Sequence, residues 1–302
     1  MADDIPFKRE FDYEYGRVDQ LTPLIRRVIA PNPGPFTFTG TGTYIIGSGG
    51  GLAVIDPGPV IHSHIDAIMN AVQPGEHISH ILITHTHMDH SPAAAPLKAR
   101  CQAPIYAYGV HGGAGDGDKV EEGADRAFEF DHKVVDGDVI EGDGWTMDCV
   151  HTPGHTSNHI AYGLREEKAL FTGDHVMGWS TSVISPPDGD MDAYMASLKK
   201  LLDRDDEIYW PTHGTAIENP KPFVRAFMFH RRTRDRQIMD CLKEDIIHIP
   251  DMVARMYRDV DKGLHPAASR SVLAHIIALA KRGEILCDDT EPGLKSNYRL
   301  PQ

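Results

Sequence analysis

The sequence predicts an α/β fold followed by a small helical unit, and three observations lead to this prediction. Over residues 1–210, short β-branched runs bounded by turn residues alternate with amphipathic helical patterns. After Pro222 the pattern changes to long helical runs, each opened by a proline. The charge changes at the same place: residues 1–220 carry 15 Lys and Arg against 33 Asp and Glu, a formal charge of −18, whereas residues 221–302 carry 15 against 11, a charge of +4. We therefore expect two domains, over 1–220 and 221–302.

In the first domain, runs of β-branched and aromatic residues mark the strands. The expected strands are residues 44–46, 52–55, 78–83, 105–108, 145–150, 159–163 and 170–172. The expected helices are residues 60–72, 92–99 and 191–202. The glycine-rich GSGGG at 47–51 lies between two strands and not before a helix, so it predicts a hairpin turn. Because strands and helices interleave, we expect sheets with helices packed on their outer faces.

The basic second domain predicts three helices, at 223–247, 250–260 and 266–282. Two short strands then surround a turn at Glu291, Pro292 and Gly293. Helix, helix, helix and hairpin is the order of elements in a winged-helix unit.

Composition is that of an ordinary globular protein, with 41% hydrophobic and 25% charged residues in 302. No apolar run approaches the roughly 20 residues of a bilayer-spanning helix. The start, MADDIPFKREFDYEYG, lacks the apolar core of a secretory signal and is too acidic for a transit peptide, so we expect a cytoplasmic protein without membrane contact. Cys101, Cys149, Cys241 and Cys287 form no C-x-x-C, which argues against a disulfide framework and a cysteine zinc site.

Chemically active side chains gather in THTHMDH, residues 84–90, directly after the apolar run ISHILIT. His85, His87, Asp89 and His90 lie on the turn between this strand and the next helix, where α/β folds expose functional groups. Three imidazoles and a carboxylate packed this closely would repel one another if protonated, whereas a divalent cation satisfies all of them. The segment therefore predicts a metal site.

Three other strand ends carry an imidazole or a carboxylate. His155 follows the strand in VHTPGHTSNH, Asp174 the strand in LFTGDHV, and His213 the strand in IYWPTHG. Four such strand exits imply convergence on one edge of the fold. Seven ligands with one bridging carboxylate exceed the four that one ion takes, so they predict two metal ions. The remaining histidines that we considered, His62, His64, His159, His230 and His275, lack such contexts and are expected to be surface or helix-packing residues.

The H-x-H-x-D-H motif and the spacing of the later histidine, aspartate and histidine resemble the metallo-β-lactamase superfamily over roughly residues 20–220. The resemblance implies an αββα sandwich in which His85, His87 and His155 hold one metal, Asp89, His90 and His213 hold the other, and Asp174 bridges them. It also implies that Asp56, in LAVIDPG, supports the metal loop from behind the ligands. The basic C-terminal part and FTGDHVMG are similar to the β-lactamase-like protein 2 branch, although Thr212 stands where such relatives often have glycine.

Hydrolysis is the reaction class that the resemblance implies. Two cations about 3.5–4 Å apart lower the pKa of a bridging water, so the expected nucleophile is a metal-bridging hydroxide. Asp89 and Asp174 are the expected catalytic residues, because Asp89 can orient the hydroxide and Asp174 holds both ions. Zinc is the expected metal, since imidazole and carboxylate ligands without thiolate suit it, and manganese and iron are the alternatives.

Two substrate classes stay open. A small-molecule ester, thioester or lactone needs a neutral or mildly polar pocket, which the acidic domain can provide. Single-stranded RNA, the substrate that the branch resemblance implies, needs cationic side chains along its path. The cluster that could supply them consists of Arg225, Arg231, Arg232, Arg234 and Arg236. The same arginines are neighbours on a helix, where a solvated face or a salt-bridged packing surface is the commoner explanation. Thr181 and Ser182, which follow Asp174, are candidate contacts for a substrate phosphate or carboxylate.

Two hypotheses compete with a dinuclear hydrolase. A persulfide dioxygenase with a single iron resembles this chain in the same H-x-H-x-D-H motif, and metal analysis separates the two. A binding module with purely structural metals is the other hypothesis, but closed structural sites rarely keep an open coordination position. The winged-helix unit is expected to cover the active site or to form an interface between copies, which would make the protein a homo-oligomer.

Overall fold

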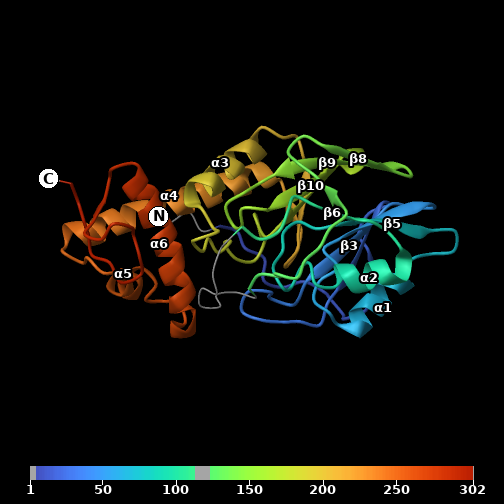
Figure 1. Ribbon diagram of the computed structural model, residues 1–302, viewed down its shortest axis with the longest axis horizontal. Coiled ribbons are helices and arrows are strands. Elements are labelled where there is room, and N and C mark those ends of the chain that lie inside the picture. The colour runs from blue at the N-terminus through green and yellow to red at the C-terminus, as the bar shows by residue number, and fades with distance from the viewer. Residues whose placement is uncertain (1–4, 113–122, 302) are drawn as a thin grey trace.

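The computed structural model describes residues 5–112 and 123–301, in which two sheets pack face to face (Figure 1). The strands of the first sheet are β1 (Asp19–Gln20), β2 (Ile25–Ile29), β3 (Gly42–Ile46), β4 (Gly51–Ile55), β5 (His77–Leu82), β6 (Ile105–Ala107) and β7 (His132–Lys133), in that spatial order. The strands of the second sheet are β8 (Val139–Gly142), β9 (Trp145–His151), β10 (Ile160–Leu164), β11 (Ala169–Gly173), β12 (Ile208–Pro211) and β13 (Ile217–Glu218). Their spatial order is β13-β12-β11-β10-β9-β8.

Helices cover the outer face of each sheet. The helices α1 (His62–Asn70) and α2 (Ala94–Cys101) pack on the first sheet, and α3 (Met191–Leu202) and the start of α4 (Pro220–Lys243) pack on the second. The alternation along β4 shows the reason, because Leu52 and Val54 face the helices whereas Ala53 and Ile55 face the other sheet. A short 3₁₀ helix, η1 (Arg165–Glu167), joins β10 to β11. The predicted αββα sandwich is confirmed.

The C-terminal part has the predicted order of helix, helix, helix and hairpin. Its elements after α4 are α5 (Ile249–Met256), the 3₁₀ turn η2 (Lys262–Leu264), α6 (His265–Lys281), β14 (Leu286–Cys287) and β15 (Tyr298–Arg299). They form their own apolar core at one end of the molecule (Figure 1). The helix α4 belongs to both cores, because Phe223 and Phe227 pack in the second sheet's cluster and Ile238 and Leu242 pack in the C-terminal one. The two units therefore share one long helix next to the predicted boundary.

One local prediction in the first sheet is confirmed, and one of its strands was not predicted. The GSGGG segment is the predicted hairpin turn, since Ile46 pairs with Ala53 in antiparallel strands and Gly47 has a φ of +116°. By contrast, the sequence did not indicate β2 as a strand, because Arg26 and Arg27 interrupt its apolar run. Both arginines are buried, and Arg26 forms two hydrogen bonds, of 2.7 and 3.0 Å, with the carboxylate of Glu76.

The second glycine-rich stretch, residues 111–119, lacks the G-K-[ST] of a nucleotide loop and predicts a surface loop, and all but its first two residues lie outside the described ranges. Within those ranges every helix is too short or too polar to cross a bilayer.

Candidate metal centre

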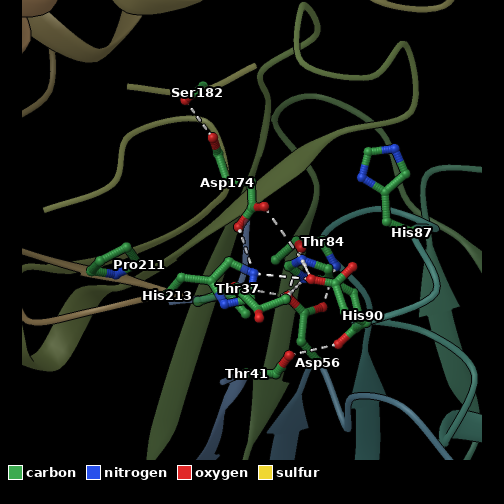
Figure 2. Close-up of polar contacts among 12 residues, drawn as sticks. Thr37, Thr41, Asp56, Thr84, His87, His90, Asp174, Ser182, Pro211 and His213 are labelled. Carbon is green, nitrogen blue, oxygen red and sulfur yellow. Dashed lines mark hydrogen bonds and ion pairs between the residues drawn. The ribbon is translucent and has the colours of Figure 1, made fainter. Parts of the chain in front are cut away.

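The predicted ligands meet at one edge of the sandwich. The strands β4 and β5 are parallel, as are β11 and β12, so the carboxyl ends within each pair point the same way. Asp56 follows β4, the 84–90 segment follows β5, and Asp174 and His213 follow β11 and β12. Figure 2 shows the side chains of His90, Asp174 and His213 pointing toward one another. The structure thus brings together residues that are up to 128 positions apart, from His85 to His213.

The first cluster consists of three buried imidazoles. His87 Nδ1 lies 3.1 Å from His85 Nε2 and 3.2 Å from His155 Nε2. Two nitrogens bound to one tetrahedral zinc at about 2.0–2.1 Å would lie roughly 3.3 Å apart, which fits this spacing. Burial, together with the neighbouring imidazoles, holds the pKa of His85 and of His87 well below its ordinary value, and burial also lowers that of His155. The three rings are therefore neutral and have lone pairs available for a cation.

The second cluster combines two imidazoles with two carboxylates. His213 Nε2 lies 3.1 Å from Asp89 Oδ2 and 3.5 Å from Asp174 Oδ1, while His90 Nε2 lies 3.4 and 3.5 Å from the Oδ2 atoms of Asp89 and Asp174. His90 Nε2, His213 Nε2 and Asp174 Oδ1 are buried and have no hydrogen-bond partner among the described residues. Buried polar atoms are normally paired, so this convergence fits a metal ion.

The charges of the second cluster also favour a cation. Burial disfavours an imidazolium at His90, but the carboxylates of Asp89, Asp174 and Asp56 outweigh it and hold the pKa of His90 well above its ordinary value. Burial likewise disfavours a charged Asp174, but His213 and His90 lower its pKa to about 2. The carboxylates are therefore ionised, and protons or a metal ion must neutralise them. Together the two donor sets fit a pair of divalent ions.

Asp56 holds the metal loop at its base. Its Oδ1 accepts a hydrogen bond of 2.8 Å from the backbone N–H of Thr84, and its Oδ2 lies 2.6 Å from Thr84 Oγ1, 2.9 Å from His90 Nδ1 and 3.1 Å from Thr212 Oγ1. Thr212, the one departure from the resemblance, thus adds a donor to Asp56. Because Asp56 accepts the Nδ1 hydrogen of His90, the Nε2 lone pair is left for the metal.

Backbone carbonyls orient two other ligands in the same way. His155 Nδ1 lies 2.7 Å from the carbonyl oxygen of Val183, and His213 Nδ1 lies 3.1 Å from that of Gly40. Donation from Nδ1 fixes the tautomer and turns Nε2 toward the cluster.

One expectation about the other histidines is wrong. His159 was expected at the surface or against a helix, but it is buried beneath the first cluster, with its ring centroid 5.2 Å from that of His85. Its Nε2 accepts a hydrogen bond of 3.2 Å from the backbone N–H of Asp174. The only signal in the sequence was its position four residues after His155. His175 is also buried, between His159 and Tyr194.

The two candidate substrate contacts lie beside the second cluster. Ser182 is buried, and its Oγ lies 2.5 Å from the carbonyl oxygen of Asp174 and 2.8 Å from that of His175 (Figure 2). This hydroxyl is directed at the backbone of Asp174 and His175, and a contact of Ser182 with substrate stays a prediction. Thr181 is half-buried next to it, and its contact with substrate stays a prediction.

Known proteins share both parts of this architecture. A family model described as metallo-beta-lactamase superfamily matches residues 37–213, and one described as beta-lactamase associated winged helix domain matches residues 249–291. A beta-lactamase-like protein 2 homolog of Caenorhabditis elegans is 32% identical over 275 residues, which are 89% of this chain and 88% of that protein. An atrochrysone carboxyl ACP thioesterase of Cryptosporiopsis sp. is 31% identical over 228 residues, 75% of this chain and 65% of that protein. The crystal structure of a beta-lactamase domain protein from Burkholderia ambifaria has a TM-score of 0.76 at 18% identity, over 99% of this chain and 96% of that one.

Proposed function

Because this chain belongs to the metallo-beta-lactamase superfamily and is a metal-dependent hydrolase, we propose that it works with two metal ions, one in each cluster, joined by Asp174. The observation that carries the proposal is the convergence of His90 Nε2, His213 Nε2 and Asp174 Oδ1, all buried and without a hydrogen-bond partner among the described residues, beside three neutral imidazoles. Zinc is the metal that we propose for both clusters, with manganese and iron as the alternatives, because the donors are imidazoles and carboxylates without thiolate.

When bound, the ions supply a water of lowered pKa as nucleophile and a Lewis acid for the scissile carbonyl or phosphoryl group. The side chains of the chain hold and orient these partners. Asp89 stays ionised, because His90 and His213 outweigh the cost of its burial and hold its pKa well below the ordinary value. Its carboxylate can accept a hydrogen bond from the attacking water and so direct it. Asp174 follows β11 and belongs to the second cluster, and its carboxylate is the group that would be shared between the ions.

An acyl substrate, an ester or a thioester, is the class that we propose. The thioesterase named among the relatives supports it, and so does the charge of −18 on residues 1–220, which disfavours a polyanion near the site. An aromatic pair beside the second cluster also suits an apolar acyl group. Phe38 stacks on Trp179 with ring centroids 4.8 Å apart. Trp179 packs closely on the backbone beside His213, because a Cβ added to Gly214 would lie 3.1 Å from Trp179 Cδ1.

Metal analysis with a thioester assay tests this proposal. Protein purified without chelator is expected to contain two ions per chain by elemental mass spectrometry and to hydrolyse acyl thioesters of N-acetylcysteamine. Stripping the metal with a chelator should abolish turnover, and adding zinc should restore it, because the attacking water is then acidified again. Hydrolysis that survives complete metal removal would contradict the mechanism, and a single iron per chain would favour the dioxygenase hypothesis.

One observation favours a second candidate function, cleavage of single-stranded RNA. Arg225, Phe229, Arg232 and Arg236 lie at helical spacing on one exposed face of α4, and we call them the basic face. The Arg236 guanidinium lies 5.4 Å from the Phe229 ring centroid, and none of the three arginines is ion-paired within the described ranges. Free cations around an exposed aromatic ring suit a backbone of phosphates with stacked bases.

A triple substitution separates the two functions. Replacing Arg225, Arg232 and Arg236 with glutamine should weaken binding of a labelled single-stranded RNA about tenfold or more and reduce the slope of log K against log salt by about 2, since each contacted phosphate contributes roughly 0.7. Thioester hydrolysis should stay unchanged, because the basic face lies outside both clusters. RNA binding or cleavage equal to wild type in the triple variant would exclude this face as the nucleic-acid contact.

A further inference from the structure

We propose that Arg231, on the helix shared by the two units, is a positioning residue that holds the backbone around Asp174 and His155 and thereby sets the geometry of both metal clusters. The inference rests on the proposed dinuclear site. The sequence grouped this arginine with four others, for which nucleic-acid contact, a solvated face and a salt-bridged packing surface all stayed open.

The side chain of Arg231 does not belong to the basic face but packs against α3 and the segment around Ser182. It is 3% exposed, whereas its neighbour Arg232 is exposed. Among the described residues no carboxylate lies within ion-pair distance of its guanidinium, and its Nε has no hydrogen-bond partner. Ion pairing therefore does not explain the position of Arg231. Because burying a cation without an anion costs free energy of folding, its other contacts must account for its buried position.

The contacts of Arg231 lead to the second cluster in two steps. Its Nη2 donates a hydrogen bond to the carbonyl oxygen of Ser182, and its guanidinium lies 5.1 Å from the ring centroid of Tyr194. The Tyr194 hydroxyl lies 2.8 Å from the carbonyl oxygen of His175 and 3.2 Å from Ser182 Oγ. The Ser182 hydroxyl in turn lies 2.5 Å from the carbonyl oxygen of Asp174 (Figure 2). The guanidinium therefore holds Ser182 in place, and the Ser182 hydroxyl in turn holds the backbone of Asp174.

The same segment reaches the first cluster. Val183 follows Ser182, and its carbonyl oxygen accepts the 2.7 Å hydrogen bond from His155 Nδ1. If the Ser182 carbonyl moves, the acceptor that orients the His155 ring moves with it. Partners that orient metal ligands typically contribute 10–100-fold to metal affinity. Arg231 acts on both clusters through residues 182 and 183.

A purely structural explanation is that Arg231 only packs α4 on the second sheet. Arg234, three residues further along α4, provides a matched control for that explanation. Its guanidinium also lies over a tyrosine ring, 4.3 Å from the centroid of Tyr257, and it also donates to a backbone carbonyl, that of Met256, at 3.3 Å. These partners, Tyr257 and Met256, pack against the apolar core of the C-terminal unit, which contains none of the proposed metal ligands. Arg234 also donates a hydrogen bond of 2.7 Å to Gln237 Oε1, and among the described residues none of its partners hydrogen-bonds to a metal ligand.

The experiment compares Arg231→Met, Arg231→Lys and Arg234→Met in the full chain. Zinc dissociation constants are measured by competition with a chromophoric chelator, the visible spectrum is recorded after cobalt substitution, and unfolding is followed by denaturant. Arg231→Met is expected to weaken zinc binding about tenfold and to change the cobalt spectrum. Arg231→Lys, which keeps a donor for the Ser182 carbonyl, should recover part of the affinity. Arg234→Met should lose stability but bind zinc as wild type does.

Zinc affinity and cobalt spectrum equal to wild type in Arg231→Met would overturn the inference, as would an equal loss of affinity in Arg234→Met. If Arg231→Met does not fold, Tyr194→Phe is used, which removes the hydroxyl and keeps the ring, and unchanged zinc affinity in it overturns the inference as well. The wild-type titration tests the two-ion site separately. If wild type binds one ion, the dinuclear proposal fails. The zinc dissociation constants of the variants are then compared for that single ion, which still tests the role of Arg231.

Discussion

Replacing Asp174 with alanine is expected to reduce kcat/KM for the thioester by roughly a thousandfold or more and to lower the metal content from two ions per chain to one. The second cluster loses one of its four donors, and the bridge that we propose between the two ions is lost with it. In the metal-free protein Asp174 is also one of the carboxylates that raise the pKa of His90 and of His213. Steady-state kinetics and elemental mass spectrometry on the same preparation measure both effects.

Asp66→Ala is the matched control for this substitution. Asp66 is an exposed carboxylate on α1 that pairs at the surface with Arg100, at 2.5 Å, so its removal should leave turnover and metal content unchanged. Full turnover in Asp174→Ala with two ions still bound would refute the role of Asp174 as the shared ligand. Loss of turnover with both ions retained would instead restrict its role to the chemical step.

Replacing Asp56 with alanine is expected to destabilise the fold by about 3–5 kcal/mol and to weaken zinc binding in the second cluster 10–100-fold. The substitution leaves the buried donors of Thr84, His90 and Thr212 without their acceptor. Alanine also fits poorly into the left-handed backbone conformation of Asp56, whose φ is +49°. Denaturant unfolding with and without chelator, together with chelator competition, measures the two quantities.

Asp56→Asn is the graded comparison, because asparagine tolerates the same backbone conformation and keeps one acceptor oxygen. We expect its stability and zinc affinity to lie between those of wild type and Asp56→Ala. If Asp56→Ala lost stability but bound zinc with unchanged affinity, Asp56 would support the loop without orienting His90. If Asp56→Asn were no better than alanine, the charge of Asp56 rather than its geometry would matter.

Much of the fold could be predicted because local patterns agree with the final structure. The predicted helix at 191–202 has the same bounds as α3, and the helix is amphipathic with its apolar side on the second sheet. The strand β2 escaped prediction because two buried arginines break its pattern. Their burial depends on partners distant in sequence, such as Glu76, which no local pattern reveals.

Residue types and their order along the chain were enough to indicate which side chains could form a metal centre and that they would lie close together. Ligand types are a property of the residues, and strand ends in a layered α/β fold share an edge whatever the details of packing. His85 through His90, His155, Asp174 and His213 could therefore be named before any coordinates.

Which of two neighbouring residues is buried and which is exposed depends on the packing of the whole chain. Arg231 and Arg232 are adjacent in one cluster of arginines, yet Arg231 is buried against the backbone of Ser182 and Arg232 belongs to the basic face. His159 likewise lies beneath the first cluster instead of at the surface. Helical and strand periodicity fix only the relative directions of side chains, and the direction that points inward depends on which surface another part of the chain presents.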